Sequence, residues 1–305
     1  MIRRLGFIGL GNMGGPMCAN LVRAGFDVRA YDRDAAALAR ARDSGARAAA
    51  SAGDCAREAE AVITMLPAPP QVEQVMLGEG GVIAALPPGG LAIDMSTSST
   101  AVGRRIVQAA GERGVEVLDA PVAGHPRRAA AGALWIYAGG PAEAFASARP
   151  LFEAIGDPER ILHVGGHGAG YTVKLLLNLL WFIQSVATGE VLAVGVRAGV
   201  ALEQLHAALI ASPANTHFLE HDLWPVIADG DYDRAFPLRL VTKDLGLAVD
   251  LAGGAGVPVE LTALVEQVHR RARSAYGDDG GQLSAIRLYE DLAGLELRLP
   301  RSSER

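Results

Sequence analysis

Lys174 and Asn178 are the residues of this chain whose types and spacing first suggest chemistry. They stand four residues apart at the start of a long apolar segment with helical periodicity, so both side chains would leave the same face of a helix. The glycine-rich stretch 165–170 places Lys174 about one turn into that helix, where the N-terminal dipole and burial disfavour a charged amine. Such a lysine could donate a proton to a carbonyl oxygen and recover it in the reverse direction.

Lysine is rare in this chain. Of 28 basic residues only Lys174 and Lys243 are lysine, and the other 26 are arginine. We therefore expect each lysine where a titrating amine or a compact point charge is needed. The alternative interpretations are a surface lysine at 174, a buried amide that caps a backbone group at Asn178, and an exposed pair of neighbouring charges for Lys243 and Asp244.

Short apolar runs alternate with helical patterns over the first half of the chain. The expected strands are 5–9, 27–31, 61–66, 91–95, 115–120 and 134–138, and the expected helices are 13–24, 34–43, 70–77, 99–112 and 141–155. This alternation predicts an α/β fold with a doubly wound, mostly parallel sheet. Beyond residue 165 the helical segments are 171–197, 238–253 and 259–275. We expect a dinucleotide-binding domain over 1–165 and an all-α domain over 166–305, with a frayed end at 301–305.

A glycine pattern follows the first expected strand. Residues 9–14 read GLGNMG, which matches GxGxxG between a strand and a helical pattern. In a Rossmann-like fold such glycines allow a tight turn, close approach to a pyrophosphate and packing of helix on strand, and the helix N-terminus faces the phosphates. The expected cofactor-binding residues here are Gly9, Gly11, Asn12, Met13 and Gly14. A purely structural glycine turn is the alternative.

Asp32 ends the second expected strand, at the place where an acid would accept hydrogen bonds from the adenosine ribose. A carboxylate there repels a 2′-phosphate and favours NAD. Arg33 could instead bind that phosphate, so NADP is the second possibility, although a solvent-exposed loop charge is the simpler interpretation of Arg33.

Composition excludes several classes of function. The net charge of −6 gives the chain no excess positive charge with which to bind nucleic acid or anionic lipid. Cys18 and Cys55 form no metal-ligand cluster, and they suit a reducing, cytoplasmic compartment. Polar residues, among them Glu190, interrupt the apolar stretch 175–196, which favours a buried helix over a membrane span. We therefore expect a soluble protein with no metal and no membrane or nucleic-acid partner.

Four blocks of sequence resemble the β-hydroxyacid dehydrogenases, the family of 3-hydroxyisobutyrate dehydrogenase and tartronate semialdehyde reductase. They are GFIGLGNMGGPMCANL from Gly6, DAPVAG from Asp119, GAGYTVKLLLN from Gly168 and FPLRLVTKDLGLA from Phe236. The blocks span almost the whole chain in the family's order. The resemblance implies a Rossmann domain, a helical C-terminal domain, an active site in the cleft between them, and a homodimer or homotetramer formed through the helical domain.

The resemblance also implies roles for individual residues. Lys174 would be the general acid and base of a hydride transfer with a nicotinamide, and Asn178 would orient the substrate oxygen or Lys174. Lys243 would reach the nicotinamide or the substrate anion. Further positions implied at the cofactor are Leu66, Pro67, Thr97 and Phe236. A helix N-cap is the alternative for Thr97 and a core position for Phe236.

The substrate loop departs from the family, whose usual pattern is DAPVSGG, because residues 119–125 read DAPVAGH. The implied substrate-binding residues are Val122, Ala123, Gly124 and His125. Ala123 has no hydroxyl to hold a carboxylate, and His125 replaces a glycine. If His125 or Arg127 turns inward, the pocket would favour a more strongly anionic head group such as a phosphonate or sulfonate. Solvated loop charges are the alternative.

These patterns together predict an NAD(P)-dependent oxidoreductase that interconverts a small 3-hydroxyacid, or a similar anionic alcohol, with its semialdehyde or keto form. An imine reductase of the same fold is one alternative, and Lys174 counts against it. A non-catalytic dinucleotide-binding interaction protein is the other. The presence of both Lys174 and Asn178 counts against loss of activity.

Overall fold

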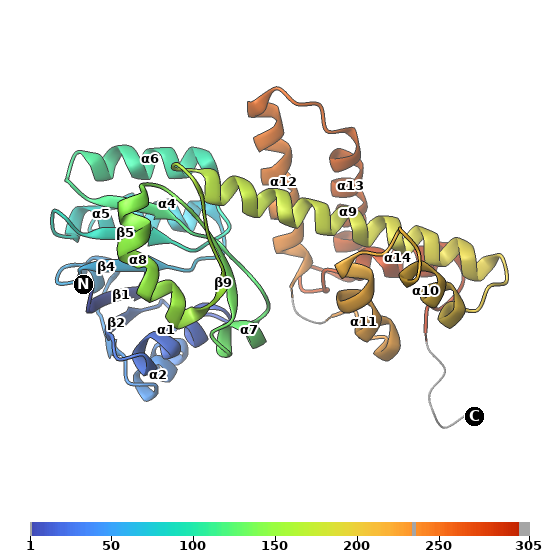
Figure 1. Ribbon diagram of the computed structural model, residues 1–305, viewed down its shortest axis with the longest axis horizontal. Coiled ribbons are helices and arrows are strands. Elements are labelled where there is room, and N and C mark those ends of the chain that lie inside the picture. The colour runs from blue at the N-terminus through green and yellow to red at the C-terminus, as the bar shows by residue number, and fades with distance from the viewer. Residues whose placement is uncertain (1, 234–235, 299–305) are drawn as a thin grey trace. The chain divides into compact units, whose positions relative to one another are not determined.

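The chain forms two compact units, Met1–Leu175 and Leu176–Arg305, in a computed structural model that describes residues 2–233 and 236–298 (Figure 1). The end expected to fray, 301–305, lies outside the described residues. The first unit is built on a mostly parallel sheet and the second on helices. The predicted fold class is therefore confirmed.

The sheet of the first unit has the strand order β3-β2-β1-β4-β5-β6-β8-β7, with β9 paired to β8. Its strands are β1 (Arg4–Ile8), β2 (Asp27–Tyr31), β3 (Arg47–Ala48), β4 (Ala61–Thr64), β5 (Leu91–Asp94), β6 (Glu116–Asp119), β7 (Val122–Ala123), β8 (Leu134–Gly139) and β9 (Gly156–Gly165). The pairs from β3 through to β6 are parallel, because a helix or helical turn returns the chain between successive strands. The pairs that β8 makes with β6 and β7 are antiparallel.

Helices cover both faces of this sheet (Figure 1). One layer contains α1 (Gly14–Arg23), α2 (Ala35–Asp43), α7 (Pro126–Ala130) and α8 (Ala142–Ile155), and the other contains α3 (Ala52–Ala56), α4 (Pro69–Leu77), α5 (Val82–Ala85) and α6 (Thr100–Gly111). Strand residues alternate between the two cores: Ile63 and Ile93 pack in the first, and Val62 and Ala92 in the second. Burial on both faces explains the continuous apolar runs in the sequence.

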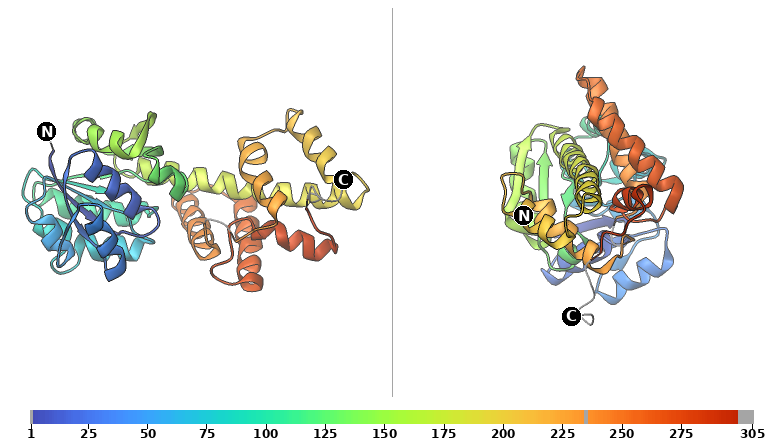
Figure 2. Two further views of the ribbon diagram at one scale, coloured as in Figure 1. Left: turned by 90° about the horizontal axis from the view of Figure 1, so that it is seen from below. Right: turned by 90° about the vertical axis from the view of Figure 1, so that its right-hand side faces the viewer.

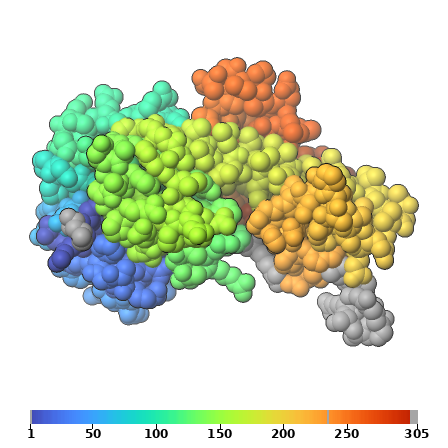
Figure 3. Space-filling view, in the orientation of Figure 1, coloured from blue at the N-terminus to red at the C-terminus, as the bar shows by residue number. Residues whose placement is uncertain are grey.

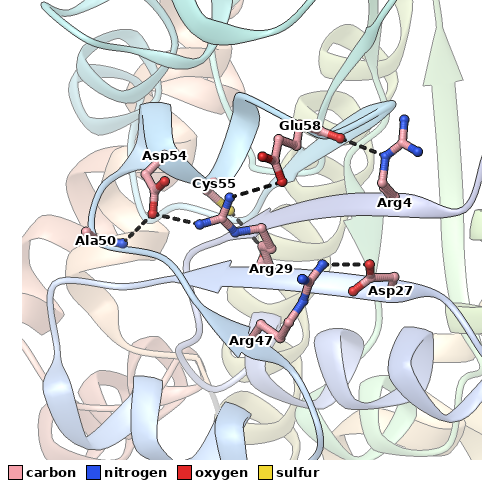
Figure 4. A network of polar contacts seen from close by, with 8 residues as sticks. All are labelled: Arg4, Asp27, Arg29, Arg47, Ala50, Asp54, Cys55 and Glu58. Atoms are coloured by element: carbon pink, nitrogen blue, oxygen red, sulfur yellow. Dashed lines mark hydrogen bonds and ion pairs between the residues drawn. The ribbon is translucent and has the colours of Figure 1, made fainter.

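A polar network ties β1 and β2 to the segment around α3 (Figure 4). Arg29 on β2 contacts Asp54 at 2.9 Å and Glu58 at 3.8 Å, and the Arg4 side chain donates to the Glu58 carbonyl oxygen at 2.9 Å. The Ala50 amide and the Arg29 guanidinium both lower the pKa of Asp54. These contacts hold β1 and β2 to α3 and to the residues that follow α3.

The second unit is helical. It contains most of α9 (Ala169–Arg197) and all of α10 (Leu202–Ile210), the π-helix η1 (Phe218–Leu223), α11 (Trp224–Asp229), α12 (Leu238–Ala255), α13 (Glu260–Tyr276) and α14 (Ser284–Ala293). Phe182 and Val186 of α9 share a core with α12, α13 and α14, whereas Leu192, nearer the end of α9, shares one with α10, η1 and α11. Figure 2 shows the ribbons of these helices beside α9. Helix α9 is thus the element around which this unit packs.

Burial of α9 by its own chain is incomplete. Large apolar side chains stay exposed at Leu176, Leu177, Leu180, Val191 and Val194, and part of the α9 surface is uncovered in Figure 3. The helix is long and apolar enough to cross a membrane, and only 33% of its most apolar stretch is buried. Its Glu190 nevertheless accepts a hydrogen bond from Tyr289 of α14 at 3.0 Å, and one face packs on the other helices.

Candidate functional site

The glycine loop between β1 and α1 is shaped by backbone contacts. Gly9 has φ of 96°, and a side chain there would overlap the Met65 carbonyl oxygen. A side chain at Gly14, where α1 begins, would overlap the Gly9 carbonyl oxygen. A Cβ added at Gly11, in contrast, meets nothing within 4 Å. Gly9 and Gly14 therefore close the turn, and Gly11 faces open space of the kind that a pyrophosphate would need.

Asp32 is oriented by this loop. Its Oδ2 accepts from the Leu10 amide at 2.5 Å, and its Oδ1 accepts from the Asp34 amide at 2.8 Å. Each carboxylate oxygen can accept more than one hydrogen bond, so these contacts leave capacity for ribose hydroxyls. The neighbouring Arg33 is exposed. Open space at Gly11 and an oriented acid at Asp32 are a chemical fit for a dinucleotide.

The next strand ends supply the other positions expected at the cofactor. β4 ends at Thr64, earlier than predicted, and Leu66 and Pro67 follow it. The Leu66 amide donates to the Ser96 hydroxyl at 2.9 Å, which joins the ends of β4 and β5. Thr97 is half-buried, and its alternative as a helix N-cap is wrong, because the Ser99 hydroxyl caps α6 by accepting from the Val102 amide at 3.2 Å.

The expected substrate loop follows β6. Val122 is buried, Ala123 is half-buried, and Gly124 adopts φ of 126° before the exposed His125 at the start of α7. Arg127 is also exposed, so neither of these two cationic candidates is turned into the unit's core. The guanidinium carbon of Arg128 lies 5.5 Å from the centre of the Trp135 ring. The outer part of the loop is therefore open to ligand or solvent.

Lys174 lies on α9 at 8% exposure, one turn beyond the helix start. The amides of Gly168 and Tyr171 donate to the two carboxylate oxygens of Asp119, at 2.7 and 3.1 Å. The Asp119 carboxylate at the N-terminus of α9 also complements the positive end of the helix dipole. The alternative of an ordinary surface lysine is wrong, because the side chain is largely buried.

Asn178 and Lys243 meet at Asp244, within the helical unit. Asn178 Nδ2 donates to Asp244 Oδ2 at 2.7 Å, and Lys243 Nζ lies 3.0 Å from Asp244 Oδ1. The Asp244 side chain has no exposed area and that of Lys243 is 17% exposed, so the pair is not the exposed one considered as an alternative. The hydrogen bond between Asn178 and Asp244 joins α9 to α12.

Phe236 packs against the core formed by α9, α12, α13 and α14, next to the start of α12, and stays half-buried. This packing agrees with the core interpretation and leaves part of its ring accessible. The sequence analysis did not identify three further polar residues that are hydrogen-bonded to one another at the strand ends and the start of α9: Asp94, Tyr171 and Thr64. A signal was present, since Thr64 and Asp94 are polar residues within the expected apolar strands 61–66 and 91–95, and they end the observed strands β4 and β5.

Two family models match this chain. One, of the NAD binding domain of 6-phosphogluconate dehydrogenase, covers residues 4–166. The other, described as NAD-binding of NADP-dependent 3-hydroxyisobutyrate dehydrogenase, covers 168–289. Together they span both units.

Relatives match over nearly the whole length. The chain is 40% identical to a 3-hydroxyisobutyrate dehydrogenase of Pseudomonas aeruginosa, over 87% of this chain and 90% of that one. It is 34% identical to a 3-sulfolactaldehyde reductase of Escherichia coli, over 89% and 90%. A Mycobacterium tuberculosis 3-hydroxyisobutyrate dehydrogenase solved with L-serine superimposes with a TM-score of 0.87 at 32% identity, covering 94% and 99%.

Proposed function

The chain belongs to the 3-hydroxyisobutyrate dehydrogenase family of β-hydroxyacid dehydrogenases, and from this premise we propose that it interconverts a small 3-hydroxyacid, or a similar anionic alcohol, with its semialdehyde or keto form. The chemistry is NAD(P)-dependent hydride transfer. The observation that carries the proposal is the burial of Lys174, which lies near the start of α9 in the unit that also contains the glycine loop and Asp32.

Residues of the first unit would hold the cofactor. Gly9, Gly11, Asn12, Met13 and Gly14 would surround the pyrophosphate at the start of α1. Asp32 would accept from the ribose hydroxyls, which favours NAD over NADP because its carboxylate repels a 2′-phosphate. When bound, the nicotinamide supplies the hydride donor or acceptor of the reaction. The residues proposed on its side of the site are Leu66, Pro67, Thr97, Phe236 and Lys243.

The chain's own residues manage the proton and the orientation of the substrate. In the reductive direction Lys174 Nζ donates a proton to the carbonyl oxygen, and in the oxidative direction it takes the proton from the alcohol. The amide of Asn178 is fixed by Asp244, so it can orient the reacting oxygen without first rearranging. Lys243 contributes a compact positive charge toward the substrate anion.

The loop that contains Val122, Ala123, Gly124 and His125 is proposed to bind the anionic head group. Because Ala123 offers no hydroxyl, the backbone amides and the exposed His125 and Arg127 are the donors that this loop can supply. Such donors pair well with a strongly anionic group. The likeness to a reductase of 3-sulfolactaldehyde supports testing sulfonates beside carboxylates.

A homodimer or homotetramer in the cytoplasm is the proposed assembly, formed through the exposed apolar face of α9. Burying a leucine contributes about 1.5–3 kcal/mol, so several of them would stabilise such an interface. Leu180→Glu should lower the molar mass measured by light scattering, whereas Leu162→Glu, at a leucine of β9 that is 48% exposed against 56% for Leu180, should not. An unchanged mass for Leu180→Glu would exclude this face.

The activity itself is tested with a substrate panel. Purified enzyme is mixed with NAD or NADP and 3-hydroxycarboxylates, their sulfonate and phosphonate analogues or, in the reductive direction, cyclic imines, while the absorbance of reduced nicotinamide is followed. We expect oxidation of at least one anionic alcohol. Turnover of imines without any alcohol oxidation would favour the imine reductase, and binding of cofactor with no turnover would favour the non-catalytic protein.

A further inference from the structure

Two buried carboxylates lie side by side at the carboxyl ends of two inner strands of the sheet. Asp94 ends β5, Asp119 ends β6, and the two are register partners in a parallel pair of strands. Their exposures are 1% and 3%. Neighbouring parallel strands are about 4.8 Å apart, so the charges would repel one another at close range. Burial raises the pKa of both groups, and hydroxyl and amide donors oppose that rise.

Asp94 accepts from hydroxyl groups on three segments. Its Oδ1 accepts from the hydroxyls of Thr64 and Ser96, each at 2.6 Å. Thr64 ends β4, and Ser96 follows β5. Its Oδ2 accepts from the Tyr171 phenol at 2.6 Å. The third donor does not come from the ends of the strands, because Tyr171 is in the first turn of α9.

Tyr171 therefore bonds to both acids. Its backbone amide donates to Asp119 and its side chain donates to Asp94. The backbone amides of Gly168 and Tyr171 tie the start of α9 to a single strand, β6, through Asp119. The Tyr171 side chain adds a contact to a second strand, β5, and so restricts the position of the first turn further.

The surrounding residues make room for this arrangement. The Tyr171 ring is 2% exposed and lies against Gly103 of α6, where an added Cβ would come within 2.8 Å of the ring. At Gly170 a side chain would overlap the carbonyl oxygens of Asp119 and Tyr137. A helix start this close to the strand ends requires glycine at 170, and the buried ring requires glycine at 103.

We propose that Tyr171 is a positioning residue for the reaction: through Asp94 and Asp119 it fixes the first turn of α9 and so sets the place of the Lys174 amine. Lys174 follows three residues later, about 4.5 Å along the helix, so a rotation or shift of the first turn moves the amine directly. The inference rests on the role proposed for Lys174. Tyr171 itself performs no proton transfer.

The test compares Tyr171→Phe with Thr64→Val in the full-length enzyme. Both variants keep side-chain shape and remove one hydroxyl donor to Asp94, but only Tyr171 belongs to α9. Tyr171→Phe should lower kcat by about 10-fold to 100-fold with the KM for cofactor unchanged, since small misplacements of a catalytic group have effects of that size. Thr64→Val should have a much smaller effect on kcat. In a Lys174→Ala background, Tyr171→Phe should cause no further loss.

A second readout needs neither cofactor nor substrate. The chain has two lysines, so protein labelled with ε-¹³C-lysine gives two ε-carbon signals, which Lys243→Arg assigns. Tyr171→Phe should shift the Lys174 signal and leave the Lys243 signal in place. Thr64→Val should shift neither.

Wild-type kcat and an unshifted Lys174 signal in Tyr171→Phe would overturn the positioning role, as would equal losses of kcat with and without Lys174 or an equal loss in Thr64→Val. If Lys174→Ala is fully active, the proposed function of Lys174 falls and the positioning role falls with it. Should Tyr171→Phe fail to fold, Gly103→Ala displaces the same ring and must give the same pattern of losses.

Discussion

Gly170→Ala is the substitution whose effect can be worked most directly from the structure. The added methyl group would overlap two carbonyl oxygens, of Asp119 and Tyr137, and would lie 2.9 Å from Asp119 Oδ2. Backbone oxygens cannot give way as a flexible side chain can, so the start of α9 must retreat by about 1 Å. A misplacement of about 1 Å typically costs about 100-fold in rate. We therefore expect kcat to fall about 100-fold, equivalent to about 2.7 kcal/mol in the activation free energy.

The effect on folding should be smaller than the effect on rate. Alanine favours a helix over glycine by about 1 kcal/mol, and overpacking costs about 1–3 kcal/mol, so the net loss in the free energy of unfolding is about 0–2 kcal/mol. Thermal unfolding measures this loss. Binding of NAD, followed by fluorescence titration, should be unchanged, because Gly170 packs on β6 and β8 whereas the glycine loop and Asp32 follow β1 and β2, and the strands β4 and β5 lie between them.

Gly166→Ala is the matched control, since a Cβ at that position meets nothing within 4 Å. Steady-state rates are measured by nicotinamide absorbance for both variants and the wild type. A kcat near the wild-type value in Gly170→Ala would refute the inference that close packing of α9 on the strand ends is needed for the rate. Equal losses in the two variants would show that glycine content of the segment matters, and not the contact at 170.

Three further predictions follow from individual contacts. Asp32→Ala should weaken NAD more than NADP in a binding titration, and the opposite ranking would show that Arg33 governs the choice of cofactor. Burial raises the pKa of Cys18 and of Cys55 to about 12, so thiolate is scarce at pH 8, and a thiol reagent should label both cysteines after unfolding and neither before it. Asp244→Ala should lower kcat about 10-fold or more by releasing the Asn178 amide, with cofactor affinity retained; wild-type kcat would contradict this.

The elements that could be predicted from sequence are those with long or fully apolar patterns. β2 was predicted at its observed bounds, and the patterns of α9, α12 and α13 marked the helical unit. β3, β7, α3 and α5 have two to five residues each, too few to show a period. β9 was missed although it has ten residues, because it opens with Gly-Asp-Pro and alternates poorly.

The candidate site was predicted unevenly for a physical reason. Lys174, Asn178, Asp32 and the glycines belong to motifs whose spacing is local in the sequence. The acceptor of the Tyr171 phenol is 77 residues away, and the partner of Asn178 is 66 residues away, so both contacts depend on the tertiary fold. Sequence patterns place a side chain on an element, whereas such contacts need the packing between elements.

Substitution of Lys174 tests most directly the central claim, that the amine of this buried lysine transfers the proton during hydride transfer. Turnover of the best substrate from the panel is compared for the wild type and Lys174→Ala, with NAD affinity measured separately and with primary amines added. The variant should lose about two to four orders of magnitude in kcat, keep its affinity for NAD, and regain part of its activity with methylamine. A variant that turns over at the wild-type rate would contradict the account.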